Sequence, residues 1–374
     1  MKIFYFVKNI AKVPSCHYNM LMLKDLGYTV IAILGESTDA INQKLNDNDI
    51  KTFIMTDTEP VKLMGISVVD KLQSYYKYRQ FSKRILKNSY EKGDVLFIGT
   101  GDTGISLYSL FTNYKSVLCL KELYDNQSTI YKRILKSLCL QATTVVACEK
   151  NRARIMQNVW GLKERPFIIP NKPYTDVLPR NMSGSNEKLQ NIINNIKNKK
   201  SIIYQAYHIT YANELIKLAQ ALKLANKDYL LVLMGIVDNP DDIKRIKEIY
   251  PNVYCTGFVK SPKHIEVTSN AYIGITVYPE NILNNLFCAP NKIYEYACFG
   301  IPTLANDIPG LVETIGVNRA GVCVDWNNVL DLKEAIIDID KNYKKYHENA
   351  MGMFNKTDCL TMINNIVKYT IKKE

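Results

Sequence analysis

The stretch of sequence that decides the fold covers residues 290–315 and reads PNKIYEYACFGIPTLANDIPGLVETI. Its leading proline suits the first turn of a helix, and Gly300 suits the C-terminal cap. Helical spacing places Asn291, Lys292 and Glu295 on one face. Free N–H groups and a lysine at a helix start favour phosphate, and a carboxylate one turn later can accept both hydroxyls of a ribose. The pattern indicates a nucleotide site, although a capped surface helix with a Lys–Glu pair would look the same.

Around this stretch, strand-like and helix-like segments alternate along the 374 residues. Hydrophobic residues make up 47% and charged residues 22%, which is normal for a protein with a sizeable core. The alternation predicts an α/β class with parallel sheets. In the first half we expect strands at residues 3–8, 29–34, 52–55, 95–98, 116–120 and 144–147. We expect helices there at residues 16–26, 39–46, 71–92, 105–111 and 130–140.

The length favours two domains, each with a doubly wound, Rossmann-like pattern. The first is expected over residues 1–173 and the second over residues 201–354. Residues 174–200 change to a polar character and are expected to be a linker with room for one helix. The helical end, residues 355–374, is expected to pack back on the first domain.

Several function classes are disfavoured by composition. The nine cysteines are scattered and form no C-x-x-C pair, which favours free thiols in a reducing cytoplasm. The four histidines are too dispersed for a metal cluster, and Asp338–Asp340 is a D-x-D only in spelling, because it lies in a helical stretch. We therefore expect neither metal nor cofactor. No signal peptide is visible and no apolar run is long enough to span a membrane, so a cytoplasmic location is expected.

A second motif, GTGDTG at residues 99–104, has the G-x-G-x-x-G spacing of a dinucleotide-binding turn. Glu122 lies where the ribose partner would be expected. However, such a motif normally follows the first strand, and here three strands come before it. A tight strand-to-helix turn explains the glycines without a ligand, and a contact with acceptor or donor phosphate, involving Thr103, is a further interpretation. We favour the turn over an NAD site.

The string at residues 290–315 resembles the donor-site signature of family 4 glycosyltransferases with the GT-B architecture. Residues 253–259 resemble the strand and turn that hold the nucleotide base in that family, and residues 203–207 resemble the opening of its second domain. In the first half, residues 121–125 and 169–171 look like family landmarks. The resemblance covers nearly the whole chain and implies two Rossmann-like domains that face a cleft.

The resemblance implies roles for individual residues of the second domain. Glu295 would bind the nucleotide ribose, and Gly257 with Phe258 would hold the base through backbone groups. Lys292, together with N–H groups around Asn291, would face the pyrophosphate. The expected donor-side residues are Gln205, His208, Gly257, Phe258, Asn291, Lys292 and Glu295.

Three departures from the family pattern concern the pyrophosphate and sugar contacts. Many members carry a second Glu where this chain has Phe287. A glycine and a basic residue often follow the first strand of the second domain, and here the chain has Ala206 and offers only His208. A His often precedes the Glu of the first-domain motif, and here Lys121 precedes Glu122.

Catalytic and acceptor-side roles can also be assigned from the resemblance and from position. The expected catalytic residues are Lys121, Glu122 and Lys292. Ligands gather beyond the carboxyl ends of parallel strands, so the loop after the first strand is expected to contact the acceptor. The expected acceptor-side residues are Pro14, Ser15, His17 and Thr103, although a solvated loop histidine is an alternative for His17.

Charge is unevenly distributed between the two halves. Residues 1–173 hold 25 Lys or Arg against 15 Asp or Glu, whereas residues 174–374 hold 23 against 21. Within the first half, residues 71–87 mix six basic residues with four aromatics. Such a segment can lie on anionic lipid headgroups or form a solvated helix face. We expect no nucleic-acid partner, because the chain holds no nucleic-acid motif.

Together these patterns predict a hexosyltransferase that moves a sugar from a nucleotide donor to a saccharide or lipid-linked acceptor, with UDP favoured over GDP. The resemblance implies retention of anomeric configuration without a metal. It also suggests bacterial surface-polysaccharide synthesis, such as capsule or O-antigen, on the inner face of the cell membrane. The alternatives are a nucleotide-sugar epimerase of the same architecture, an NAD oxidoreductase, and a non-catalytic sugar-binding relative.

Overall fold

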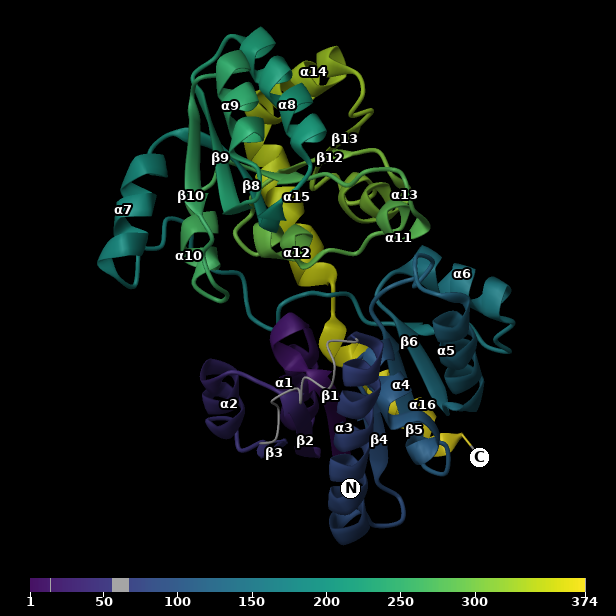
Figure 1. The fold of residues 1–374 in the computed structure, drawn as a ribbon. Helices are drawn as coiled ribbons and strands as arrows, with labels where there is room; N and C mark the ends of the chain where they lie inside the picture. Colours follow the sequence, from purple (N-terminus) through teal and green to yellow (C-terminus); the bar gives the residue numbers. More distant parts are fainter. Residues whose placement is uncertain (14, 56–66, 374) are drawn as a thin grey trace. The chain divides into compact units, whose positions relative to one another are not determined.

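The computed structural model describes residues 1–13, 15–55 and 67–373. The chain divides into a first unit, Met1–Tyr174 with Asp358–Glu374, and a second unit, Thr175–Thr357 (Figure 1). Each unit contains one parallel sheet with helices on both faces. The predicted α/β class with two doubly wound sheets is therefore confirmed.

The sheet of the first unit has the strand order β3-β2-β1-β4-β5-β6-β7. Every neighbouring pair is parallel. A parallel sheet is covered on both faces, which is why its central strands read as continuous apolar runs. The strands are β1 (Lys2–Asn9), β2 (Thr29–Glu36), β3 (Lys51–Ile54), β4 (Val95–Ile98), β5 (Ser116–Leu120), β6 (Thr144–Ala147) and β7 (Phe167–Ile168).

The helices of the first unit include one from the far end of the chain. They are α1 (Ser15–Asp25), α2 (Asp39–Asn46), α3 (Ser67–Ser89), α4 (Gly101–Leu107), α5 (Thr129–Gln141), α6 (Lys150–Trp160) and α16 (Cys359–Lys372). The last of these contacts α1 and three strands, and its buried Ile363, Ile366 and Val367 join the core of this unit. The Thr370 hydroxyl lies 2.8 Å from that of Thr144 on β6.

The sheet of the second unit has the strand order β10-β9-β8-β11-β12-β13, again with parallel pairs. Its strands are β8 (Lys200–Ile209), β9 (Tyr229–Val237), β10 (Val253–Gly257), β11 (Ile273–Thr276), β12 (Thr303–Asn306) and β13 (Gly321–Val324). Its helices are α7 (Glu187–Ile196), α8 (Ala212–Ala225), α9 (Pro240–Ile249), α10 (His264–Thr268), α11 (Leu283–Leu286), α12 (Asn291–Ala297), α13 (Pro309–Leu311), α14 (Val329–Lys341) and α15 (Tyr343–Lys356).

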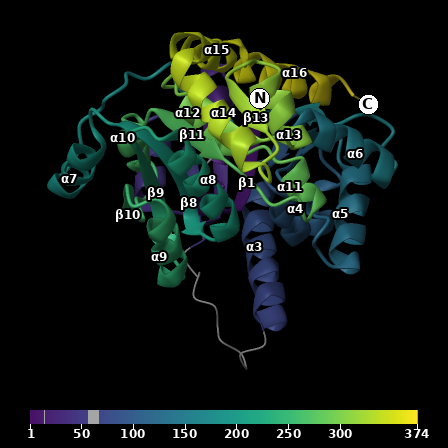
Figure 2. The same cartoon turned by 90° about the horizontal axis from the view of Figure 1, so that it is seen from above.

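Two separate cores cover the faces of the second sheet. Residues of α8, α9 and α14 form one, and Figure 2 shows α14 beside α8. Residues of α7, α12 and α15 form the other. Within residues 174–200, the segment expected to be a linker with room for one helix, α7 buries Leu189, Ile192, Ile193 and Ile196 in this core. Their spacing is that of one helix face, which the polar composition of the segment obscured.

In each sheet the strand order reverses beside its first strand. The reversal lies between β1 and β4 in the first unit and between β8 and β11 in the second. Loops on either side of such a point separate, and ligands of open α/β sheets bind outside the carboxyl ends of these strands. The fold thus assigns one candidate site to each unit, beyond β1 and β4 and beyond β8 and β11.

The glycines of GTGDTG form the turn from β4 into α4. Thr100 caps this helix by accepting the N–H of Thr103 at 3.1 Å, so the helix starts at Gly101, earlier than predicted. A Cβ on Gly101 would meet the Tyr124 hydroxyl at 2.6 Å, and one on Gly104 would meet Leu118 at 2.9 Å. Close packing of α4 explains these glycines without a dinucleotide.

Asp340, near the end of α14, joins three segments of the second unit. Its side chain is 7% exposed and accepts from Lys200 Nζ at 2.5 Å, Lys227 Nζ at 2.9 Å and the Tyr272 hydroxyl at 2.7 Å. Burial alone would raise the pKa of this carboxyl, but these hydrogen bonds hold the pKa well below its ordinary value. Asp340, the second acid of the D-x-D at residues 338–340, therefore has a structural role within the second unit.

The variant Asp340→Asn is expected to lower the free energy of unfolding by about 2–3 kcal/mol at neutral pH, because it weakens several hydrogen bonds to a charged group. A depressed folded pKa stabilises the protein above the unfolded pKa of about 3.9, and the effect is lost as the pH falls below it. The free energies of unfolding of variant and parent, measured in urea, should therefore become more similar as the pH is lowered. Glu334→Gln on the exposed side of α14 is the control and should change stability by less than about 0.5 kcal/mol. A difference in the free energy of unfolding between parent and Asp340→Asn that stays unchanged down to about pH 3 would contradict this account.

Candidate nucleotide-binding site

The carboxylate of Glu295 lies at the centre of a polar cluster beyond β8. Gln205, on β8, donates from Nε2 to Glu295 Oε2 at 2.6 Å. His264, the first residue of α10, places Nε2 at 3.3 Å from the same oxygen. The side chains of Glu295 and His264 are 16% and 15% exposed. Both contacts that the described residues make with this carboxylate fall on Oε2, which leaves Oε1 to accept a ligand hydroxyl.

His264 is a site residue that the sequence did not reveal. Burial alone would lower the pKa of its imidazole, but Glu295 raises that pKa above its ordinary value. Burial would likewise raise the pKa of the Glu295 carboxyl, but the charges of His264 and Lys292 hold it below its ordinary value. Glu295 is thereby kept ionised in a largely enclosed position. Nothing in the loop sequence before α10 marks its histidine as a partner of α12.

Gln205 is held in the orientation that this cluster needs. Its side chain is buried, and its Oε1 accepts from the Thr268 hydroxyl at 2.7 Å. Since the amide oxygen faces Thr268, the amide N–H₂ faces Glu295. The structure therefore places Gln205 behind the carboxylate, where it positions Glu295.

Lys292 brings a partly buried ammonium to the same cluster. Its Nζ donates to the Gln205 carbonyl at 2.9 Å and lies 5.2 Å and 5.4 Å from the ring centroids of Tyr204 and Tyr278. Burial lowers the pKa of Lys292 to about 8, although Glu295 opposes this shift. An arriving anion would stabilise the charged form, so the site is suited to a phosphate group.

A second part of the predicted donor side lies around Phe258. β10 ends at Gly257, whose φ of +74° favours glycine. The exposed Phe258 ring meets the exposed Tyr207 ring edge-on, with centroids 4.9 Å apart. His208 places Nδ1 at 2.7 Å from Asp238 Oδ1, so its partner is an acid on the surface. An exposed aromatic pair of this kind offers a flat, apolar surface.

The predicted donor-side residues thus fall into two groups. One group consists of Gln205, Lys292 and Glu295 with Asn291, which is the first residue of α12. The other consists of His208, Gly257 and Phe258. His264, Thr268, Tyr207 and Tyr278 join these groups without having been predicted.

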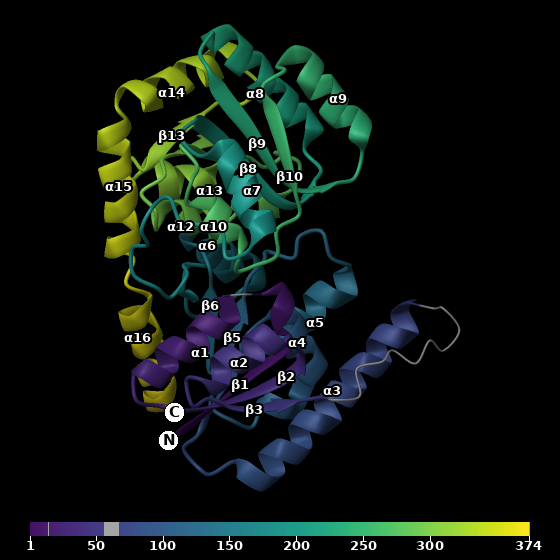
Figure 3. The same ribbon diagram turned by 90° about the vertical axis from the view of Figure 1, so that its left-hand side faces the viewer.

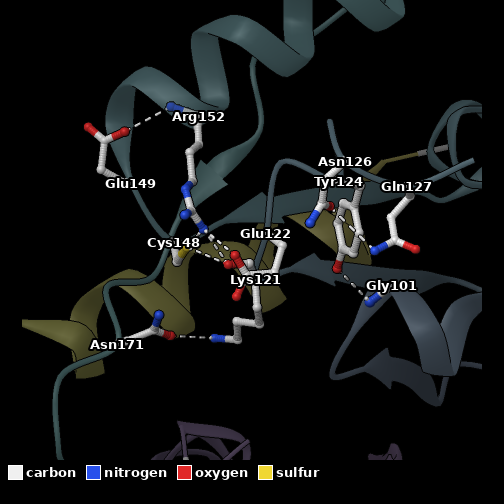
Figure 4. Close-up of polar contacts among 10 residues, drawn as sticks. All are labelled: Gly101, Lys121, Glu122, Tyr124, Asn126, Gln127, Cys148, Glu149, Arg152 and Asn171. Carbon is white, nitrogen blue, oxygen red and sulfur yellow. Dashed lines mark hydrogen bonds and ion pairs between the residues drawn. The ribbon is translucent and has the colours of Figure 1, made fainter. Parts of the chain in front are cut away.

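In the first unit, Lys121 and Glu122 follow β5 but face different partners (Figure 4). Lys121 is buried, and its Nζ donates to Asn171 Oδ1 at 3.2 Å. Glu122 is half-exposed, with Oε2 3.5 Å from Arg152 Nη1. The buried Arg152 also donates to the Lys121 carbonyl. Lys121 and Glu122, the two predicted catalytic residues of the first unit, therefore have different side-chain partners.

The predicted acceptor-side residues differ in their accessibility. Ser15 and His17 lie in the first turn of α1, which begins one residue before the expected helix. Both side chains are buried, so the alternative of a solvated loop histidine does not fit His17. Thr103 is fully buried, and its Oγ1 accepts the Lys8 backbone N–H at 3.0 Å. The Thr103 hydroxyl makes its hydrogen bonds within the protein, to Lys8 and Thr100. Because Thr103 is fully buried, its position does not fit a direct acceptor contact. Pro14 lies outside the described residues.

Among the residues that the structure describes, no group of three or more His, Cys, Asp or Glu side chains is arranged to hold a metal ion. All nine cysteines are free thiols. None of the described helices combines the length and apolar character needed to cross a bilayer.

Part of the second unit is similar to a known protein family. The family model described as Glycosyl transferases group 1 matches residues 186–351. The matched residues contain the whole Glu295 cluster and the Phe258 pair. No curated protein matches the chain in sequence.

Solved structures share the fold over the whole chain. A glycosyltransferase from Rickettsia africae is 18% identical, with a TM-score of 0.71 and coverage of 100% of this chain and 99% of that one. HepE from Anabaena, solved with UDP and glucose, is 14% identical, with a TM-score of 0.66 and 98% coverage of both chains. Sucrose-phosphate synthase from Thermosynechococcus elongatus is 13% identical, with a TM-score of 0.66 and 98% coverage of both. The expected GT-B fold of glycosyltransferases is confirmed.

Proposed function

We propose that this chain is a glycosyltransferase that moves a hexose from a nucleotide donor to a saccharide or lipid-linked saccharide. The observation that carries the proposal is the combination of Glu295 and Lys292, one turn apart on α12, within the residues that match the group 1 glycosyl transferase model. The carboxylate can accept ribose hydroxyls through its open oxygen, and the ammonium can meet a diphosphate. The two parts of a nucleoside diphosphate are thereby matched.

A UDP-sugar is the proposed donor. HepE, which shares the fold, was solved with UDP and glucose, which supports a uridine nucleotide here. The exposed rings of Tyr207 and Phe258 provide a surface on which a flat base can pack. The backbone of Gly257 is proposed to approach the base from the same side.

Lys292 is proposed to stabilise the departing nucleotide diphosphate, with no divalent ion required. Negative charge grows on the diphosphate as the bond to the sugar breaks, and a fixed ammonium lowers the energy of that charge. Its hydrogen bond to the Gln205 carbonyl fixes its position before the substrate arrives. Retention of anomeric configuration is implied by the resemblance to family 4 glycosyltransferases and is part of the proposal.

Ligand-induced stabilisation separates this proposal from an NAD oxidoreductase. UDP and UDP-glucose are expected to raise the melting temperature, whereas NAD and NADH are expected to leave it unchanged. A ligand at a hundredfold excess over its dissociation constant adds about 2.7 kcal/mol of stability, so the shift is measurable. A shift with NAD but not with UDP would overturn the assignment.

We further propose that the first unit docks on an anionic membrane surface through α3, the long blue helix of Figure 3. Leu72 and Tyr76 are 60% and 64% exposed, and helical spacing brings the exposed Lys83 and Lys87 to the same side. Apolar and basic side chains on one helix face suit the interface of an anionic bilayer. Such docking fits an enzyme of bacterial surface-polysaccharide synthesis on the inner face of the membrane.

The structure also changes which tyrosines of this segment can serve that role. Tyr75 and Tyr78 are buried, and the Tyr78 hydroxyl donates to the Ile33 carbonyl at 2.7 Å. Of the aromatics counted in residues 71–87, Tyr76 is the exposed one, and Phe81 is partly buried. Among these four aromatics, Tyr76 is therefore the one that we propose as a lipid contact.

A variant with Leu72→Ser, Tyr76→Ser, Lys83→Gln and Lys87→Gln is expected to lose most of its co-sedimentation with anionic vesicles. Each basic residue near the surface contributes about 1 kcal/mol, and raised salt should weaken the parent in the same way. Lys163→Gln with Arg165→Gln, two exposed residues after α6, is the charge control. UDP affinity should be unchanged in all three proteins. Equal sedimentation of parent and the α3 variant would leave α3 as a solvated helix.

A further inference from the structure

Lys121 carries a buried ammonium that lacks a counter-ion among the described residues. It follows β5 and is only 8% exposed. The contact described for its Nζ is to the neutral amide oxygen of Asn171, at 3.2 Å. An ammonium has three N–H donors, and one of them is accounted for in this way. Burying such a charge without an opposite charge is costly, so its environment calls for an explanation.

Glu122, next to Lys121 in the chain, and Glu149, which follows the neighbouring strand β6, both contact groups other than the Lys121 ammonium (Figure 4). Glu122 pairs with Arg152 at 3.5 Å. Glu149 caps the start of α6 by accepting the backbone N–H groups of Asn151 and Arg152, each at 2.8 Å. These carboxylates satisfy the start of α6 and its arginine, and neither forms an ion pair with Lys121.

Lys121 lies at the carboxyl end of β5, on the side of the sheet where the fold predicts a ligand. β5 lies beside β4, next to the reversal of strand order in the first unit. Burial raises the pKa of the Cys16 thiol at the start of α1, and the charge of Lys121 opposes that shift. Burial also raises the pKa of Cys119 on β5 to about 12, with Lys121 again opposing it. The charge of Lys121 thus acts on buried thiols of α1 and β5.

We propose that Lys121 binds an anionic group, a phosphate or a carboxylate, carried by the sugar acceptor. The proposal rests on the proposed glycosyl transfer. An acceptor anion would supply both the missing counter-charge and acceptors for the remaining N–H donors, as in charge-assisted hydrogen bonds. The donor nucleotide already finds its matching groups at Glu295 and Lys292 in the other unit. The excess of basic residues in the first half would attract the same class of acceptor.

Calorimetry on the UDP-saturated protein tests this inference with glucose, glucose 6-phosphate and glucuronate. The parent is expected to bind at least one charged sugar about tenfold or more tightly than glucose, as for a hydrogen bond to a charged group. Lys121→Gln is expected to remove this preference, and Lys121→Arg to retain part of it. Lys163→Gln, at an exposed position of the same unit, should keep it in full. Comparing charged and neutral sugars within one variant makes the result independent of a general loss of stability.

A second measurement does not depend on the identity of the sugar. The lysine ammonium signals of the UDP-saturated protein are followed by NMR during titration with inorganic phosphate, and the Lys121 signal is assigned by its loss in Lys121→Gln. The Lys121 signal is expected to shift, and that of Lys163 to stay in place. An unshifted Lys121 signal, or equal sugar preferences in parent and Lys121→Gln, would overturn the proposal. A variant that loses UDP affinity alone would also overturn it, because Lys121 would then serve the donor. Failure of the parent to bind UDP would instead count against the proposed glycosyl transfer.

Discussion

Replacing Lys292 by glutamine is expected to lower kcat/KM for sugar transfer by about 10²–10³-fold, the range found when a fixed group that stabilises transition-state charge is removed. The ammonium is held by the Gln205 carbonyl and faces two tyrosine rings, so its position is set before the donor binds. Lys260→Gln, on an exposed loop of the same unit, is the matched control and should keep full activity. Equal kcat/KM values in parent and Lys292→Gln would remove this residue from the mechanism.

The pH dependence of the parent follows from the same residue. Because burial lowers the pKa of Lys292 to about 8, the free protein loses this positive charge as the pH rises through that value. The value of kcat/KM should therefore decline above about pH 8, because the Lys292 ammonium is then deprotonated in the free enzyme. Nucleotide binding should raise the pKa, so that about half a proton is taken up at pH 8. Calorimetry of UDP binding in buffers with different ionisation heats measures this uptake, which should vanish in Lys292→Gln.

The second large effect is expected at Glu295. Glu295→Gln should weaken UDP binding by about 1.5–3 kcal/mol, which corresponds to a loss of one hydrogen-bonding interaction with a charged group. The substitution keeps the size of the side chain and leaves the His264 imidazole beside a neutral amide. Calorimetry with UDP and GDP provides the measurement, and Glu248→Gln on the exposed side of α9 is the control. Unchanged affinity for both nucleotides would exclude Glu295 from the ribose site.

The strands were predictable because a parallel sheet needs continuous apolar segments. The bounds of β4, β5 and β6 agree with those expected from the sequence. The start of α4 was missed by four residues, because glycines disfavour helices and the packing of Gly101 against Tyr124 cannot be read locally. In α3 the mixture of basic and aromatic residues does not indicate which face meets the sheet, so the burial of Tyr75 and Tyr78 could not be predicted.

The candidate site was predictable only where its residues share one helix. Asn291, Lys292 and Glu295 are linked by helical spacing, and the structure keeps them on α12. His264 reaches Glu295 from another helix, a contact that sequence spacing alone cannot indicate. The same limit applies to Arg152, which lies far from Glu122 along the chain but pairs with it in the folded unit.

Release of UDP from UDP-glucose tests the central claim most directly, because it separates a transferase from an epimerase and from a sugar-binding protein. The parent is incubated with the donor alone and with candidate acceptors, including lipid-linked saccharides, and free UDP is measured over time. We expect stoichiometric UDP release that depends on acceptor and is lost in Lys292→Gln. Conversion of the donor sugar to an epimer, or UDP release that is independent of acceptor, would contradict glycosyl transfer.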